Sequence, residues 1–178
     1  MEIRLAILPP PKVSKMAGEL GRIYGAKFPS WFKVDNRILA PHITLFVLNI
    51  KPKDIAKLKS SAAKQVKFLK KFGLTISRHS VYPGGWTGLK IKDSKRLSVL
   101  RKTLFNALKS FDSLQPVKLK PKFSPHITLT KFKSPNNSRK AIKNSKILIR
   151  NFSAEVVAIC LSNKHSQVTK ALRIFKFK

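Results

Sequence analysis

The sequence predicts an α+β fold, and three observations support that prediction. Short apolar runs bounded by Pro, Gly or polar residues recur along the whole chain, as is typical of β-strands. Two longer segments instead place apolar residues on one helical stripe and lysines on the remaining faces, as is typical of amphipathic helices. A five-residue motif also occurs twice, once in each half of the chain. No low-complexity run or clear linker divides residues 1–178, so we expect a single domain.

The expected elements follow from these local patterns. Strands are expected over 3–8, 42–50, 74–82, 86–91, 126–132, 147–152, 155–161 and 172–177, with Pro83-Gly84-Gly85 as the turn between the third and the fourth. The prolines at 9–11 end the first strand, and a helix over 12–24 follows. A second helix begins at 51–54, because Pro is tolerated in a first turn and Asp suits its positive end. It runs to residue 69, and a third helix covers 94–109. Residues 29–40 are expected to be irregular and 116–125 to form a loop rich in Lys and Pro, and 134–145 is a polar segment for which no helix or strand is expected.

The charge balance predicts an anionic partner. The chain has 38 Lys and Arg against 7 Asp and Glu, a net charge of +31, whereas a domain of this size usually carries a magnitude of about 2–8. Such a surface attracts polyphosphate backbones through counterion release, so we expect contact with nucleic acid. An anionic membrane, or a basic bias with no charged partner, is the alternative. No acidic residue lies between Asp112 and Glu155, so one wall of any site in that stretch is expected to be strongly positive.

Cysteine usage and the start of the chain indicate a cytoplasmic protein. Cys160 is the one cysteine, so no intrachain disulfide forms, and its apolar surroundings predict a small buried hydrophobe. The apolar run at 3–8 is short and ends at prolines, unlike a signal peptide or a membrane span. We therefore expect no membrane partner, and a monomer.

The repeated motif is the most informative feature of the sequence. Pro41-His42-Ile43-Thr44-Leu45 recurs as Pro125-His126-Ile127-Thr128-Leu129, 84 residues later. Within a strand, side chains alternate between faces, so each His shares a face with its Thr while Ile and Leu point to the other side. Two such strands related by a pseudo-twofold axis would place two imidazoles and two hydroxyls around one cleft. Two ordinary hairpin strands from an old duplication are the alternative.

This set of groups suits phosphoryl transfer without a metal. One imidazole can accept a proton from the attacking oxygen and the other can give a proton to the leaving oxygen, because the pKa of histidine lies near neutrality. The hydroxyls of Thr44 and Thr128 can bind the non-bridging phosphate oxygens. A bell-shaped pH dependence around neutrality, unaffected by EDTA, is expected.

On these motifs the sequence resembles the 2H phosphoesterase superfamily, in particular the LigT-like or 2′-5′ RNA ligase group. The opening strand and its following helix, and the spacing between the motifs, extend the resemblance over essentially the whole chain. It implies a bilobal α+β domain, with two pseudo-symmetric β-rich lobes and flanking helices around a central cleft. It also implies opening of 2′,3′-cyclic phosphates on RNA ends, or cleavage and joining of 2′-5′ linkages, without metal or other cofactor.

The resemblance assigns roles to individual residues. His42 and His126 are the expected catalytic pair, and Thr44 and Thr128 bind the phosphate. We take His126 as the base and His42 as the acid, an order that the symmetry of the two motifs does not fix. Family members often carry an Arg shortly after the second motif, where this chain has Lys131, which can neutralise a phosphate but not bind it bidentately. The first motif continues Phe46-Val47-Leu48 rather than the frequent Lys-Phe-Leu, so the subfamily stays open.

Other candidate residues have a plainer interpretation. His79 and His165 lie outside the repeat and are expected at the surface. No His, Cys, Asp or Glu cluster has the spacing of a metal site. Four aromatic residues could stack on RNA bases or belong to the core, namely Trp31, Phe32, Tyr82 and Trp86.

The sequence thus predicts a metal-independent phosphodiesterase that opens 2′,3′-cyclic phosphates of RNA ends and leaves a 2′-phosphate. A 2′-5′ linkage phosphodiesterase or ligase of the same family, acting on RNA or on a small nucleotide, is the first alternative. A non-catalytic RNA-binding module on the same fold is the second, because phosphate contacts alone give nonspecific affinity.

Overall fold

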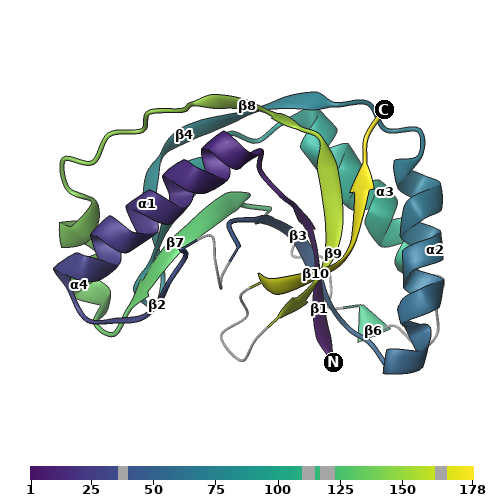
Figure 1. Cartoon of the computed structure of the whole chain (residues 1–178), viewed down its shortest axis with the longest axis horizontal. Helices are drawn as coiled ribbons and strands as arrows, with labels where there is room; N and C mark the ends of the chain where they lie inside the picture. The colour runs from purple at the N-terminus through teal and green to yellow at the C-terminus, as the bar shows by residue number, and fades with distance from the viewer. Residues whose placement is uncertain (36–39, 110–114, 117–122, 163–167) are drawn as a thin grey trace.

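In the part of the chain that the structure describes, a large antiparallel sheet has four helices outside it. Figure 1 shows the computed structural model, which describes residues 1–35, 40–109, 115–116, 123–162 and 168–178. The strands of this part are β1 (Glu2–Ile7), β2 (Ser30–Lys33), β3 (Ile43–Asn49), β4 (Phe72–Tyr82), β5 (Trp86–Ile91), β6 (Gln115–Pro116), β7 (His126–Phe132), β8 (Asn151–Ala154), β9 (Val156–Ser162) and β10 (Val168–Lys176). The helices are α1 (Pro11–Lys27), α2 (Ile55–Val66), preceded by a 3-10 turn (Pro52–Asp54), α3 (Lys95–Lys109) and α4 (Pro135–Ile142).

The order of the strands shows that the sheet has two corresponding halves. It runs β10-β9-β1-β3-β7-β5-β4-β8, so the two strands that carry the repeated motif, β3 and β7, meet at the centre. On each side the motif strand is followed by three more strands. The motif repeat and the strand order therefore share one pseudo-twofold axis, which passes between β3 and β7.

The two halves diverge from that axis. β3 and β7 pair at a single position, Ile43 opposite Ile127, and then part. Beyond that position each strand pairs with a different strand instead: β7 pairs with β2, and β3 pairs with β6. Figure 1 shows the result, with α1 and α4 on the outside of one lobe and α2 and α3 on the outside of the other. The fold is thus the bilobal α+β arrangement that the sequence predicts.

The core lies between each half-sheet and its helices. Ile43, Leu45, Ile127 and Leu129, the apolar residues of the two motifs, are all buried in it. From α1, Val13, Met16, Ala17 and Tyr24 are buried in the same core, and Leu97, Leu100, Leu104 and Leu108 form the buried stripe of α3. Because alternate residues of a strand face opposite sides, the opposite face of each half-sheet carries the motif histidines and threonines, and we call it the cleft face.

Several elements differ from the sequence-based expectation. The segment 29–40 contains β2, which pairs with β7 along the edge where β7 no longer pairs with β3. The segment 134–145 contains α4, which begins with Pro135 at its first turn. The strand expected over 147–152 begins only at Asn151, and Leu148 is 81% exposed. Residues 117–122, including Lys118, Lys120 and Lys122, lie outside the described part of the chain.

Candidate active site

The central strand pair brings the four motif side chains together. Residues directly opposite in an antiparallel pair share a face, so Ile43 and Ile127 point together into the core. Their neighbours, which are the two motif histidines and the two motif threonines, therefore all point to the other face, into the cleft. The strand pairing thus places His42 and His126 on neighbouring strands and on one face of the sheet.

Both imidazoles are held in the same way. His42 Nδ1 lies 2.9 Å from the carbonyl oxygen of Ala40, and His126 Nδ1 lies 2.8 Å from the carbonyl oxygen of Ser124. A carbonyl only accepts, so Nδ1 carries the hydrogen in both rings and donates it. Each partner is the residue two positions earlier, just before the motif proline. This arrangement fixes the tautomer and leaves Nε2 as the nitrogen for proton transfer in both rings.

Each motif strand contains one extra residue directly after its Thr. Along β7, Gly88 pairs with Thr128 and Thr87 with Thr130, so Leu129 is the extra residue; along β3, Leu45 is the corresponding one. Such a bulge shifts the alternation of side chains by one position. Thr130 and Phe132 consequently point into the core, where both are buried. Lys131 turns to the cleft face, which simple alternation from His126 would not predict.

Arg4 is a site residue that the sequence analysis did not identify. It lies on β1 opposite Val47 of β3, and its Nη1 donates to Thr44 Oγ1 at 3.1 Å. Its Nε donates to Ser162 Oγ at 2.9 Å, and Glu2 lies 3.5 Å from Nη2. Because Thr44 Oγ1 accepts from Arg4, the hydroxyl hydrogen of Thr44 can be donated to another acceptor. The one sequence signal for Arg4 is a lone charge inside an apolar strand.

Three of the four candidate aromatic residues form a row on the cleft face around Lys131. Phe32 and Trp86 are the cross-strand neighbours of Lys131 on its two sides, and Tyr82 pairs with Trp86. Lys131 Nζ lies 4.9 Å from the centre of the Trp86 ring, a cation–π contact. Phe32 packs edge-on against the same ring at 5.2 Å. Trp31, in contrast, is 56% exposed and contacts Lys133.

Tyr82 crosses the second lobe to reach His126. Their rings stack, with centroids 4.4 Å apart and an interplanar angle of 30°. Tyr82 is on β4 and His126 on β7, so the ring must pass over β5, which lies between them. Gly88 of β5 allows this, because a Cβ there would lie 3.3 Å from Tyr82 Cε2 and 2.6 Å from the Ile127 carbonyl oxygen.

Burial dominates the electrostatics of the two histidines. It lowers the pKa of His42 to about 4, with the positive charges of Arg4 and His126 adding to the effect and the hydrogen bond to Ala40 opposing it. Burial likewise lowers the pKa of His126, which the bond to Ser124 opposes and the charge of Arg4 reinforces. His42 is 4% exposed and His126 is only partly buried. At neutral pH both imidazoles are therefore neutral in the free protein.

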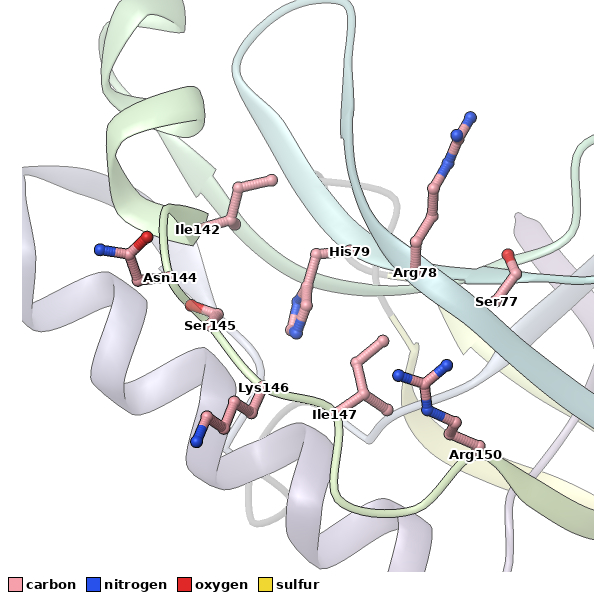
Figure 2. A pocket seen from close by; sticks show the side chains of 9 residues that line it. All are labelled: Ser77, Arg78, His79, Ile142, Asn144, Ser145, Lys146, Ile147 and Arg150. Carbon is pink, nitrogen blue, oxygen red and sulfur yellow. The ribbon is translucent and has the colours of Figure 1, made fainter.

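The other candidate residues lie elsewhere. His79 is partly buried rather than at the surface, because it faces the helices, where its Nδ1 lies 2.9 Å from the Tyr24 hydroxyl. Figure 2 shows it pointing into a cavity of about 590 Å³ at the edge of β4, which Arg78 also lines, although the Arg78 side chain extends in the opposite direction from that of His79. Cys160 is buried, as predicted. His165 lies outside the described residues.

Within the described residues, no group of three or more His, Cys, Asp or Glu side chains could hold a metal ion. No helix in the same part of the chain is long and apolar enough to cross a membrane.

A bilobal antiparallel sheet with helices outside both lobes is the architecture of the 2H phosphoesterases. The TT0787 protein of Thermus thermophilus has this fold, with a TM-score of 0.73 at 16% identity over 99% of this chain and 98% of that one. E. coli LigT complexed with 3′-AMP gives a TM-score of 0.65 at 16% identity, with coverage of 99% and 98%. The PDE domain of MHV ns2 gives 0.53 at 10% identity, with coverage of 99% and 100%.

The family follows from the sequence itself. The family model described as the 2′-5′ RNA ligase superfamily matches residues 9–167, and the chain belongs to that superfamily. Membership indicates a phosphodiesterase. No curated protein matches the sequence as a relative. Other E. coli LigT structures are complexed with ATP and with NADP+, so that protein binds nucleotides.

Proposed function

We propose that the protein is a metal-independent phosphodiesterase that opens 2′,3′-cyclic phosphates at RNA ends and leaves a 2′-phosphate. The observation that carries the proposal is the symmetric presentation of two imidazoles. Both Nδ1 atoms donate to main-chain carbonyls, so two Nε2 atoms are directed to the same cleft. Two proton-transfer groups on one cleft are what an in-line displacement at phosphorus needs, one for the entering and one for the leaving oxygen.

The reaction divides the proton transfers between the two rings. Nε2 of the base accepts a proton from water as the water oxygen forms its bond to phosphorus. The bond from phosphorus to the ribose 3′-oxygen breaks, and Nε2–H of the acid gives its proton to that oxygen. The products are a 2′-phosphate and a 3′-hydroxyl, and the pair of histidines returns to its starting state after one further proton exchange with solvent.

The deeper burial of His42 favours His42 as the base and His126 as the acid, the reverse of the order taken from the sequence. A base must be neutral before the reaction, and burial lowers the pKa of His42 to about 4. His126 is less buried, and a bound phosphate anion favours its protonated form. A substrate with sulfur in place of the leaving 3′-oxygen tests this order, because a thiolate leaves without a proton. It should restore turnover to the acid variant His126→Ala and not to His42→Ala.

The remaining cleft groups bind the phosphate. Thr44, oriented by Arg4, and Thr128 donate their hydroxyl hydrogens to the two non-bridging oxygens. Arg4 and Lys131 approach from the two lobes and supply positive charge. A hydrogen bond to a charged group contributes about 1.5–3 kcal/mol. Thr128→Ala should therefore lower kcat about ten- to a hundredfold, since each 1.36 kcal/mol is a factor of ten.

A single assay tests the proposal. The wild type and the variants His42→Ala and His126→Ala are incubated with a short RNA that ends in a 2′,3′-cyclic phosphate, and the end group is identified. We expect a 2′-phosphate from the wild type and a loss of at least a hundredfold in each variant. Equal turnover by wild type and His126→Ala would reject the mechanism.

The charge and the family together support one other candidate function. A 2′-5′ linkage presents the same phosphodiester to the same two histidines, so 2′-5′ oligoadenylates are assayed beside the cyclic-ended RNA. Turnover of the oligoadenylates alone would replace the first proposal. Salt-sensitive RNA binding with turnover of neither substrate would instead indicate a non-catalytic RNA-binding module.

A further inference from the structure

The second lobe carries a row of basic side chains that begins at His126. In the pairing of β7 with β5, His126 lies opposite Lys90, and in the pairing of β5 with β4, Lys90 lies opposite Arg78. Residues opposite each other share a face, so His126, Lys90 and Arg78 form one line across three strands on the cleft face. Arg78 is exposed and Lys90 is partly exposed. We call Lys90 and Arg78 the basic row.

Burial on both sides of the row confirms its orientation. The neighbours of Lys90, Leu89 and Ile91, are fully buried on the core face of β5. His79, next to Arg78, points toward the helices, and Figure 2 shows the Arg78 side chain extending in the opposite direction. Both cations therefore extend from the same surface as the catalytic histidine.

Nothing acidic on these strands neutralises the row. The sequences of β4, β5 and β7 contain no Asp or Glu. Neither Lys90 nor Arg78 belongs to an ion pair within the described residues. A row of uncompensated cations attracts polyanions.

The geometry of the row matches a strand rather than a single phosphate. Neighbouring strands are about 4.8 Å apart, so the Arg78 backbone is about 10 Å from that of His126. The row therefore extends about 10 Å across the sheet away from His126. The row ends at an open edge, because β8 pairs with residues 72–75 of β4 and, in the described part of the chain, no strand pairs with the outer side of residues 77–82.

We infer that the basic row binds the RNA strand upstream of the reacting end, with Lys90 on the phosphate 5′ to the terminal nucleotide and Arg78 on the next phosphate. This inference rests on the proposed function for the position of the reacting end. Phe32 and Trp86 lie on the other side of Thr128 from the basic row, whereas Tyr82 reaches over β5 to stack on His126. The terminal nucleoside and the upstream strand thus occupy different parts of one lobe.

The inference predicts a stepwise dependence on substrate length. A cyclic mononucleotide has one phosphate, a dinucleotide adds the phosphate for Lys90, and a trinucleotide adds the one for Arg78. We expect kcat/KM to rise by roughly fivefold at each step, mainly through KM, because each new contact adds phosphate binding without touching the reacting atoms. Lys90→Ala should remove the first step and Arg78→Ala the second.

Two further variants serve as controls. Arg78→Lys keeps a point charge at the same position and should keep most of the second step. The double variant Lys64→Ala/Lys102→Ala removes two exposed charges from α2 and α3, on the outside of the other lobe, and should leave both length steps in place. If the double variant reduces the steps as much as Arg78→Ala does, the effect is one of overall charge and the inference is wrong.

A binding measurement keeps the inference separate from the proposed reaction. The probe is a fluorescent trinucleotide with a terminal 2′-phosphate, titrated at several salt concentrations. For a single strand the slope of log K against log salt changes by about 0.7 per phosphate contact, so each of Lys90→Ala and Arg78→Ala should flatten it by that amount. A protein that turns over none of the substrates but shows these slopes would refute the reaction and support the row. If both variants turn over the substrates with the same dependence on substrate length and on salt as the wild type, the basic row does not bind RNA, while the proposed reaction is supported.

Discussion

Replacing Tyr82 tests whether an aromatic stack positions His126, the acid of the proposed reaction. In the structure the Tyr82 ring lies 4.4 Å from the His126 ring at an angle of 30°, within the range of an offset stack. Such a pair contributes about 0.5–1.5 kcal/mol beyond the area it buries. Tyr82→Leu should therefore lower kcat by about two- to tenfold, because the ring that transfers the proton is held less firmly. Tyr82→Phe retains the stack and should keep nearly full activity.

A titration separates positioning from a general loss of structure. Burial is the main cause of the lowered pKa of His126, and Tyr82 covers one face of its ring. In Tyr82→Leu the pKa of His126 should move up toward its ordinary value, while that of His42, which the ring does not cover, should stay where it is. The signals of the two imidazole protons in NMR spectra over pH report both values. A Tyr82→Leu protein with wild-type kcat and an unchanged His126 pKa would refute the reasoning, and equal losses in the Phe and Leu variants would assign the effect to the hydroxyl.

Three other predictions follow from the electrostatics of the site. Because the pKa values of both histidines are lowered, a plot of kcat/KM against pH should be bell-shaped with its optimum on the acid side of neutrality. Above the optimum, kcat/KM should fall about tenfold per pH unit once the acid has lost its proton. A rate that climbs steadily to pH 9 would contradict this. The free energy of unfolding should decrease by about 3 kcal/mol as pH falls from 6.5 to 4, because of His42 alone. The His42 side chain takes up a proton near pH 6.5 in the unfolded chain but only at about 4 in the folded protein. Denaturation of wild type and His42→Gln over this pH range measures the difference. Arg4→Met should raise the pKa of both histidines, because it removes a positive charge beside them. It should also lower kcat/KM by about tenfold, because Thr44 loses its hydrogen-bond donor. Arg4→Lys is the matched control.

The repeated motif predicts the centre of the fold because its two halves obey the same local rule. Alternation along a strand depends only on the chain itself, so the shared face of each His and Thr follows from sequence. The pairing of Ile43 with Ile127 then brings the two faces together. The core residues of both motifs follow in the same way, since β-branched and leucine side chains occupy the positions between the polar ones.

The position of Lys131 could not be derived from the same rule. Counting from His126, strict alternation puts Lys131 on the core face beside Ile127 and Leu129. The bulge at Leu129 reverses this, and it depends on contacts with distant residues. The carbonyl of Leu129 accepts from the amide of Val34, and the carbonyl of Leu45, the bulged residue of the other half, accepts from Arg101 Nε. Neither donor is near its acceptor in sequence.

Other misses also have a long-range cause. β2 forms only because β7 loses β3 as a neighbour after one residue pair, so nothing within 29–40 reveals it. The polar segment before Ser145 lacks an apolar stripe, yet it forms α4, whose buried Ser138 and Ala141 are small enough to pack closely. The apolar run Ile147-Leu148-Ile149 resembles a strand, but its residues pair with no strand of the described chain and Leu148 stays exposed.

The departures from symmetry explain how a duplicated site can direct a reaction that is not symmetric. Lys131 lies 84 residues after Val47, the same offset as between the histidines, so the two positions correspond, and Arg4 corresponds by its pairing to Trp86. In the first lobe the cation is Arg4, on β1 beside the motif strand β3, whereas in the second lobe it is Lys131, on the motif strand β7 itself. In the first lobe this puts the guanidinium against Thr44, beside the more deeply buried histidine. In the second it leaves room for an aromatic row and for Tyr82 to cover His126. Two identical imidazoles thus acquire different burial and different neighbours from the strands beside them, and in the proposed mechanism that difference allows one to hold a proton while the other accepts one.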